Sequence, residues 1–496
     1  MGASAPKVCI IGAGCSGFTT AKRLADHAIP FDIFEASDRV GGNWAYGNPN
    51  GVSACYQSLH IDTSKTRLQF EDFPVPADWP DFPHHSLIDG YFNAYVDRFG
   101  LRERIRFNTE VTQCRALPGG GWDVTAGGET HRYDVLAVAN GHHWKPNVPA
   151  FPGRFDGPQI HSHDYRTPFA PVDMVGRRVL VVGLGNSAVD IASELSQRPM
   201  AAKLFVAARR GVWVLPKYLG GKPSDKQALP EWMPIGLKRR LAAFVVKRAV
   251  GSMESYGLPA PDHAPLEAHP TVSSEFLLRC GSGDITVKPN IAALEGGSVR
   301  FEDGSVEAID AIVYATGYRI AFPFLSDADA PVVDNHIGLF KRLVRPERTD
   351  LWFMGLAQSL PTLVNLAEQQ SKLLAAWLTG AYGLPDAEAM RRTIAEDEAR
   401  HQGEGLRGGV LLGGEEPRRD EGPGVQVGVL ALGAVVLLRG IDVDLVGKAR
   451  DLHLREAGQL RRVVEPEVGG LEAEGEGALR LLQVGHGPAL EAPVEG

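Results

Sequence analysis

The chain has 496 residues, a hydrophobic fraction of 44%, a charged fraction of 22% and a formal net charge of −9. This length predicts two to four domains, and the composition excludes a wholly disordered chain. Because the chain is mildly acidic, we expect no nucleic-acid partner. Its five cysteines are too scattered for a disulfide framework or a structural zinc site, so we expect no metal.

The apolar segments predict a cytoplasmic protein. The apolar run in the N-terminal segment is too short for a signal peptide. The longest apolar run, residues 425–438, has 14 residues, whereas a membrane-spanning helix needs about 20. We therefore expect a protein in the reducing cytoplasm, with no membrane association.

The first elements in chain order are a strand, a helix and a second strand. Residues 7–14 are a β-branched run that ends in glycines, a helical stretch follows, and residues 31–36 form the next strand. This βαβ pattern favours a parallel sheet. The turn between strand and helix matches the GxGxxG fingerprint of a dinucleotide site, with Gly12, Ala13, Gly14, Cys15, Ser16 and Gly17.

Each glycine of this fingerprint has a physical role. The first permits a tight turn, the second lets a pyrophosphate approach the backbone, and the third lets the helix pack on the strand. Glu35, at the end of the second strand, can accept hydrogen bonds from ribose hydroxyls; the alternative is a solvated strand end. Strand, helix and acid together predict a bound dinucleotide.

A second βαβ unit begins at residue 177 and repeats the pattern. Its fingerprint has alanine in the third position and includes Gly183, Gly185, Asn186, Ser187 and Ala188. The next strand, residues 203–211, ends in Arg209 and Arg210 instead of an acid. A guanidinium binds a 2′-phosphate, which a carboxylate would repel, so we predict a preference for NADPH. The alternative for the two arginines is again a solvated strand end.

Further strands are predicted within residues 105–116, 122–126, 133–141, 298–318 and 351–357, and an amphipathic helix follows at 363–380. The predicted fold is α/β with two Rossmann-like domains, in which the NADPH-binding domain is inserted into a discontinuous FAD-binding domain. We predict the FAD-binding parts at residues 1–170 and 319–400, and the NADPH-binding domain at residues 171–318.

Residues 401–496 differ in kind from the rest. They contain no aromatic residue and no Ser, Thr, Asn, Cys or Met. Of the 96 positions, 20 are glycine, 10 are basic and 16 are acidic. Such a segment does not easily build a specific core, and we predict a disordered low-complexity tail. Two interpretations remain open, a flexible regulatory tail and out-of-frame translation of a GC-rich gene.

Two dinucleotide sites imply a redox pair, FAD with NADPH. Disulfide reductases of this architecture need a redox-active cysteine pair beside the flavin. Cys9 and Cys15 flank the first glycine loop, but a strand position and a loop position fit core packing better than catalysis. The leading acceptor for the electrons of the reduced flavin is therefore oxygen.

Between the two fingerprints, residues 155–165 match the pattern FxGxxxHxxx(Y/F) through Phe155, Gly157, His161 and Tyr165. On this motif the chain resembles the flavin-containing monooxygenases over roughly residues 5–400. GGNW at 41–44, ATGY at 315–318 and LAEQQ at 366–370 are also similar to family segments. Taken alone, His161 would be a packed linker histidine; the resemblance implies that it orients the two domains. Baeyer–Villiger relatives usually carry Trp at the position of Tyr165, which disfavours that class.

The resemblance implies an FAD- and NADPH-dependent monooxygenase similar to N,N-dimethylaniline monooxygenase. NADPH reduces FAD, oxygen adds to the reduced flavin, and bound NADP⁺ shields the resulting hydroperoxide, which oxygenates a soft nitrogen or sulfur nucleophile. The expected partners are a small-molecule substrate and O2, and a homodimer is left open. The alternatives are Baeyer–Villiger oxygenation of ketones and a non-oxygenating NADPH oxidase or redox sensor.

The resemblance also assigns further residues to the cofactor sites, namely Asn43, Trp44, Val111, Thr316, Gly317 and Gln369. Trp44 could equally be a core residue. Asp62 is the predicted catalytic residue, and it stands where similar family members commonly have Asn. An ionised Asp only accepts hydrogen bonds, so it could alter the hydroperoxide lifetime or the substrate class. The alternative for Asp62 is a loop carboxylate that caps Ser64 or Lys65.

Overall fold

The computed structural model describes residues 5–227, 230, 232–264, 270–357 and 362–403. They all belong to one compact unit, residues 1–441. The second unit, residues 442–496, lies outside the described residues. The predicted tail therefore also lies outside them, apart from residues 401–403 at the end of the last helix.

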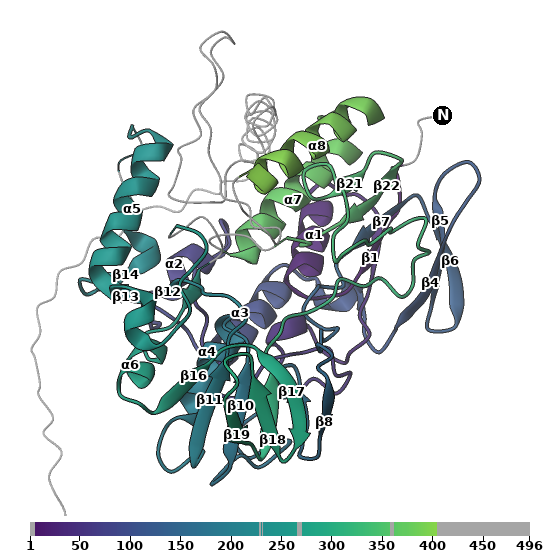
Figure 1. Ribbon diagram of the computed structural model, residues 1–496. Coiled ribbons are helices and arrows are strands. Elements are labelled where there is room, and N and C mark those ends of the chain that lie inside the picture. Colours follow the sequence, from purple (N-terminus) through teal and green to yellow (C-terminus); the bar gives the residue numbers. More distant parts are fainter. Residues whose placement is uncertain (1–4, 228–229, 231, 265–269, 358–361, 404–496) are drawn as a thin grey trace, which may run out of the picture. The chain divides into compact units, whose positions relative to one another are not determined.

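The first sheet has six strands in the order β21-β22-β7-β1-β2-β3. All neighbours pair in parallel except β21 and β22. The strands are β1 (Val8–Ile11), β2 (Phe31–Phe34), β3 (Ile105–Arg106), β7 (Val135–Val138), β21 (Val344–Arg345) and β22 (Arg348–Phe353). Every residue of β1 is buried, as expected for a central strand covered on both faces. Helices α1 (Cys15–Asp26) and α7 (Leu363–Leu378) pack side by side and share an apolar core with the first sheet (Figure 1).

The second sheet has five parallel strands in the order β16-β11-β10-β20-β9. They are β9 (Gln159–His161), β10 (Arg178–Val182), β11 (Lys203–Ala207), β16 (Ile285–Lys288) and β20 (Ala311–Tyr314). Helix α4 (Asn186–Leu195) follows β10 as α1 follows β1. The chain then returns to the first sheet at β21 and β22, so the predicted inserted Rossmann-like unit is confirmed.

The predicted domain boundaries stay a prediction. Strand β9 belongs to the second sheet, although residues 159–161 precede the predicted boundary at residue 170. The linker that carries the FxGxxxHxxx(Y/F) motif thus contributes a strand to the inserted unit.

Smaller sheets and further helices complete the fold. An antiparallel meander joins β4 (Val111–Ala116), β5 (Trp122–Ala126) and β6 (Glu129–Tyr133), and a four-stranded sheet joins β8 (Gly153–Phe155), β17 (Ile291–Gly296), β18 (Ser298–Phe301) and β19 (Val306–Ala308). Two strand pairs are β12 (Val214–Leu215) with β15 (Thr271–Val272) and β13 (Tyr218–Leu219) with β14 (Lys222–Pro223). The remaining α-helices are α2 (Lys65–Leu68), α3 (His85–Arg98), α5 (Ile235–Val250), α6 (Phe276–Gly281) and α8 (Ala387–Gly403). The 3₁₀ helices are η1 (Gly42–Trp44), η2 (Arg102–Arg104), η3 (Ser224–Lys226) and η4 (Met253–Tyr256).

Neither a membrane span nor a metal cluster occurs in the described part of the chain. None of its helices combines the length and apolar character that crossing a bilayer requires. None of its His, Cys, Asp and Glu side chains gather in threes or more around a position that could hold a metal ion.

Candidate active site

The first glycine loop joins β1 to α1, and the packing of the protein itself requires two of its glycines. Gly12 has a φ of +101°, and a Cβ there would lie 2.7 Å from the carbonyl oxygen of Ala139. A Cβ on Gly17 would lie 1.8 Å from the carbonyl oxygen of Gly12. No side chain tolerates these approaches, so the turn and the contact between helix and strand both need glycine.

Gly14 is different, because the protein leaves room for a side chain there. Its Cβ would come no closer than 3.6 Å to the Cα of Gly42. Within the described residues, no acceptor binds the main-chain N–H groups of Gly14, Cys15 or Ser16. Unpaired amides at a helix N-terminus bind anions. The loop therefore fits the pyrophosphate of a dinucleotide, which would need the space beside Gly14.

The second glycine loop, between β10 and α4, repeats this arrangement. Gly183 has a φ of +122°, and a Cβ there would lie 2.4 Å from the carbonyl oxygen of Ala315. A Cβ on Gly185 would meet no atom within 4 Å. The N–H groups of Gly185, Asn186 and Ser187 also have no acceptor in the part of the chain that is described. The structure thus holds two loops suited to a pyrophosphate.

Side chains of the second loop serve the protein's own packing. Ala188 is buried in the core at the third fingerprint position. The side-chain oxygen of Asn186 accepts a hydrogen bond of 2.9 Å from the N–H of Val272 in β15. Any contact of these residues with a cofactor stays a prediction.

Glu35 holds the first glycine loop to the end of β2. Its two carboxylate oxygens accept hydrogen bonds from the N–H groups of Ala13, at 2.7 Å, and Ser37, at 2.8 Å. Glu35 is only 8% exposed, so the alternative of a solvated strand end is wrong. Each oxygen keeps a further lone pair, and the predicted contact with a ribose stays a prediction. The role of Glu35 in fixing the loop was not foreseen from the sequence.

The two arginines that follow β11 differ in their surroundings, although both are exposed. The Nη1 atom of Arg210 lies 3.9 Å from a carboxylate oxygen of Asp262. Arg209 forms no ion pair with any described carboxylate, and the predicted contact of the two arginines with a 2′-phosphate stays a prediction.

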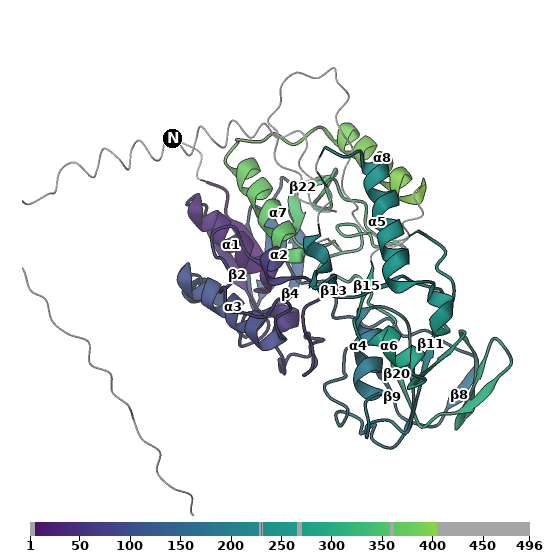
Figure 2. The ribbon, with the colours of Figure 1, turned by 90° about the vertical axis from the view of Figure 1, so that its left-hand side faces the viewer.

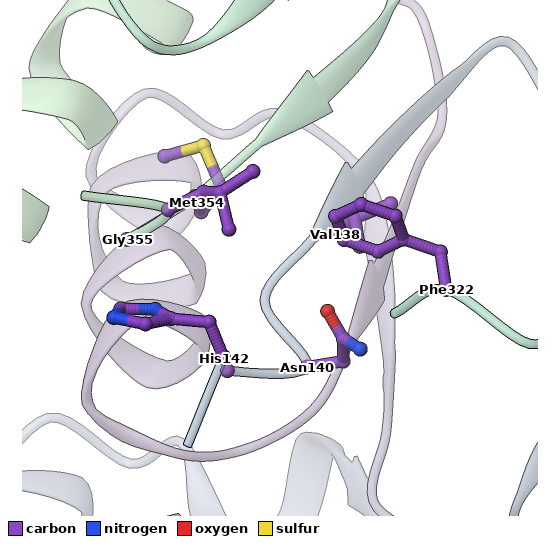
Figure 3. A pocket seen from close by; sticks show the side chains of 8 residues that line it. Val138, Asn140, His142, Phe322, Met354 and Gly355 are labelled. Carbon is purple, nitrogen blue, oxygen red and sulfur yellow. The ribbon is translucent and has the colours of Figure 1, made fainter. Parts of the chain in front are cut away.

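A pocket lies where β7 and β22 end (Figure 3). Its lining consists of Val138, Asn140, Gly141, His142, Phe322, Met354, Gly355 and Leu356. A Cβ on Gly355 would lie 2.1 Å from the hydroxyl oxygen of Ser16, so the pocket adjoins the first turn of α1. Burial lowers the pKa of His142, which keeps its ring neutral. This pocket was not foreseen from the sequence, although a short loop follows each buried parallel strand, where ligands of such sheets bind.

Three predicted cofactor residues precede this pocket in the chain. Asn43, in η1, accepts a hydrogen bond of 2.9 Å from the N–H of Ala54. Trp44 is half-buried and packs against the core of the first sheet, which agrees with the alternative of a core residue. Val111 is buried in the apolar core beside β4, so its side chain is not available to a cofactor.

The remaining predicted cofactor residues follow β20 or lie on α7. The hydroxyl of Thr316 donates to the carbonyl oxygen of Asn147, whose own N–H donates to the carbonyl oxygen of Gly317 at 3.0 Å. The amide of Gln369 donates to a carboxylate oxygen of Glu71 at 3.0 Å. Their contacts with a cofactor stay predictions.

Asp62 belongs to a half-buried charged cluster, and its partners come from the inserted unit. The Nζ atom of Lys217 lies 3.3 Å from Oδ1 of Asp62 and also donates to the carbonyl oxygen of Ile61. Burial raises the pKa of Asp62, while the lysine acts in the opposite direction. The alternative of a loop cap fails, because the N–H of Ser64 donates to Asp225 and that of Lys65 to the carbonyl oxygen of residue 81.

A second carboxylate completes this cluster. Asp190, on α4, accepts a hydrogen bond of 2.7 Å from the hydroxyl of Tyr56. Burial, followed by the negative charge of Asp62, raises the pKa of Asp190 to about 7. The cluster therefore contains two carboxylates and one ammonium group, and Asp190 exchanges a proton near neutral pH.

The FxGxxxHxxx(Y/F) motif connects the linker to the loop at Gly51 and to helix α4 of the inserted unit. Burial lowers the pKa of His161 to about 4, so its ring is neutral, and its Nδ1 accepts a hydrogen bond from the N–H of His163. The ring of His163 forms a hydrogen bond with the carbonyl oxygen of Gly51. The hydroxyl of Tyr165 donates to a carboxylate oxygen of Glu194 on α4 at 2.7 Å. These contacts suit the orienting role that the resemblance implies.

Residues 5–407 match the model of the FMO-like family, described as flavin-binding monooxygenase-like. The chain belongs to this family. It is 36% identical to the N-oxide-forming dimethylaniline monooxygenase 2 of Rattus norvegicus over 414 residues, which are 79% of this chain and 76% of the relative. Flavin-containing monooxygenase 5 of the same species is 34% identical over 78% of this chain and 76% of its own length.

Solved structures agree with this assignment. The S-allyl-L-cysteine S-oxygenase of Allium sativum aligns with a TM-score of 0.61 and 25% identity over 81% of this chain and 83% of its own. The OTEMO complex with FAD and NADP aligns with a TM-score of 0.64 over 81% of this chain and 91% of its own, and at 18% identity it supports the fold. This flavin-binding monooxygenase-like protein is an FAD- and NADPH-dependent monooxygenase.

Proposed function

We propose that the enzyme oxygenates a soft nitrogen or sulfur nucleophile. The observation that carries this proposal is its similarity to relatives of both kinds, one that forms N-oxides and one that oxygenates sulfur. The cysteines support an acceptor other than a disulfide, because all five are free and buried, and burial raises the pKa of Cys9 and Cys15. The hydroperoxide route, the cytoplasmic location and the homodimer stay predictions.

In this proposal each glycine loop holds one cofactor by its main chain. The unpaired amides of Gly14 to Ser16 bind the pyrophosphate of FAD, and those of Gly185 to Ser187 bind that of NADPH. Arg209 binds the 2′-phosphate. Bound FAD, after reduction by NADPH, supplies the oxygen atom that it takes from O2, so the chain need not provide a strong acid or base.

The surroundings of Asp62 support a catalytic part for this residue. A half-buried carboxylate alone would repel the electrons of a reduced flavin, but the ammonium of Lys217 at 3.3 Å offsets its charge. We propose that the pair sets the electrostatic potential where the two cofactors meet. Nothing in this arrangement favours a ketone over an amine or a sulfide, and the proposal of a nitrogen or sulfur nucleophile is supported by the similarity to the two relatives named above.

The test compares NADPH consumption with hydrogen peroxide release by the purified holoenzyme. N,N-dimethylaniline and thioanisole should each raise NADPH consumption and suppress peroxide, whereas cyclohexanone should do neither. Oxidation of cyclohexanone to its lactone, with no product from the other two compounds, would instead identify a Baeyer–Villiger enzyme. One hydrogen peroxide released per NADPH under all three conditions would identify a non-oxygenating oxidase.

A further inference from the structure

Two buried tyrosines bind two carboxylates that lie one turn apart on α4. The hydroxyl of Tyr56 donates to Oδ2 of Asp190 at 2.7 Å, and that of Tyr165 donates to Oε2 of Glu194 at the same distance. The two rings pack edge to face in the core of the inserted unit, with their centroids 6.2 Å apart. Both tyrosines are buried. This packing fixes the position at which the hydroxyl of Tyr56 meets Asp190.

Asp190 faces the other charged groups of the cluster around Asp62. Burial and then the negative charge of Asp62 raise the pKa of Asp190, whereas the hydroxyl of Tyr56 and the ammonium of Lys217 act in the opposite direction. The charge of Glu194 also raises this pKa. Burial and the charges of Asp190 and Asp62 in turn raise the pKa of Tyr56. The two aspartates and the tyrosine therefore influence one another's protonation.

This cluster lies where the inserted unit meets the rest of the chain. Lys217 precedes β13 and Asp62 precedes α2, and both ribbon views show these two elements side by side (Figures 1 and 2). Across the same boundary, the N–H of Ser64 donates to Asp225 at 2.7 Å. Oδ1 of Asp62 is shielded from solvent, and among the described residues it has only the ion pair with Lys217 and no hydrogen bond. This oxygen can therefore accept a proton without breaking an existing hydrogen bond.

A monooxygenase needs a proton in every turnover. One atom of O2 enters the product and the other leaves as water, whose two hydrogens come from the hydride of NADPH and from one proton of the solvent. An acid or base serves such a proton best when its pKa lies near the working pH, and Asp190 meets this condition with a pKa of about 7.

We propose that Asp190 and Tyr56 are positioning residues that act through Asp62 and hold the proton that each turnover consumes. The inference rests on the proposed catalytic part of Asp62. Reduction of the flavin adds negative charge, which disfavours an ionised carboxylate nearby. Asp190 then takes up a proton from solvent on Oδ1, while Oδ2 keeps its hydrogen bond from Tyr56. When the flavin is oxidised again, Asp190 releases this proton through Asp62.

The experiment is an anaerobic redox titration of the full-chain holoenzyme, without substrate, at several pH values. Between about pH 7 and 8, the midpoint potential of FAD in the parent should fall about twice as steeply with pH as in Asp190→Asn, because Asp190 adds a second proton to the one that the flavin takes up. Tyr56→Phe removes a hydrogen bond that favours the ionised Asp190, so the steep range should move to higher pH.

The matched control is Asp32→Asn. Asp32 also accepts a hydrogen bond from a buried tyrosine, Tyr133, at 2.6 Å. Although burial acts in the opposite direction, hydrogen bonds from Lys7 and Tyr133 lower the pKa of Asp32. Asp32 therefore stays ionised at neutral pH, and Asp32→Asn should keep the slope of the parent.

Equal slopes for the parent and Asp190→Asn, or a steep range that Tyr56→Phe leaves in place, would overturn the proposal. So would an equal loss of slope in Asp32→Asn. Flavin absorbance and circular dichroism show that each variant is folded and loaded; if Asp190→Asn loses FAD, the shift in Tyr56→Phe decides.

The titration uses neither O2 nor substrate, so its outcome is independent of the proposed function. Products from N,N-dimethylaniline or thioanisole together with equal slopes would uphold the proposed function and overturn only the role of Asp190. A steep slope that Asp190→Asn removes, in an enzyme that releases only hydrogen peroxide, would uphold the role of Asp190 and overturn the proposed function.

Discussion

Asp190 is a half-buried carboxylate that retains its proton close to neutral pH. Its pKa is about 7 in the folded chain, against 3.8 for an ordinary aspartate, because burial and the charge of Asp62 both disfavour ionisation. Its contribution to stability is therefore fully present below about pH 4 and is lost as the pH rises to about 7. The ionisation of Asp190 therefore lowers the free energy of unfolding as the pH rises to neutral.

The variant Asp190→Asn should remove this loss while keeping an acceptor for the hydroxyl of Tyr56. Between pH 5 and 7, the free energy of unfolding of the parent should fall by about 2 kcal/mol more than that of the variant. Urea unfolding at several pH values measures both. Parallel pH profiles for the two proteins would show that Asp190 titrates as an ordinary aspartate.

The ion pair between Asp62 and Lys217 should be worth more than an exposed one. Lys217→Met leaves the half-buried Asp62 without its cation, and we expect a loss of about 1–3 kcal/mol in the free energy of unfolding. Asp62→Asn added to Lys217→Met should recover most of the loss. Lys226→Met is the matched control, because its pair with Asp81 is more exposed and should cost at most about 1 kcal/mol. A double variant as unstable as Lys217→Met alone would show that the lysine acts through packing, not charge.

At the scale of the element, the turn from β1 to α1 contains glycines that are needed for two different reasons, room for a ligand and the packing of the protein itself. Gly14 has extended backbone, with φ of −70° and ψ of −177°, and free space beside it. Gly14→Val should therefore fold but lose FAD, because the side chain takes the place of the pyrophosphate. Gly17→Val should instead fail to fold, since its Cβ meets the carbonyl oxygen of Gly12 at 1.8 Å. Flavin absorbance after desalting, with circular dichroism for folding, measures both, and a fully FAD-loaded Gly14→Val would contradict the site.

The end of β11 should determine the choice between NADPH and NADH. The native enzyme should prefer NADPH by about tenfold or more, close to 1.4 kcal/mol. Arg209→Ala should remove most of this preference, while Arg210→Ala should remove less, because Arg210 already lies near Asp262. The measurement is kcat/KM for both cofactors. Equal effects of the two substitutions would show that Arg209 and Arg210 do not differ in their contribution to binding the 2′-phosphate.

At the scale of the whole molecule, features that depend on neighbouring residues could be predicted from the sequence. Both βαβ units follow from buried β-branched runs that end in glycine fingerprints, and β1, α1, β10 and α4 lie where these patterns place them. Contacts between distant segments could not be predicted. Lys217 meets Asp62 only because the fold brings them together, and no local pattern shows that Glu35 binds the amide of Ala13. The pocket lined by Asn140 and Met354 likewise forms from two strands that are far apart in the sequence.

Under the proposed function, the enzyme transfers one atom of O2 to a nitrogen or sulfur nucleophile at the expense of NADPH. The most direct measurement is mass spectrometry of the products formed from N,N-dimethylaniline and thioanisole under ¹⁸O2, with NADPH consumption recorded in parallel. The product should carry one ¹⁸O atom and should form in an amount close to the NADPH consumed. NADPH consumption with no labelled product from either compound would contradict it.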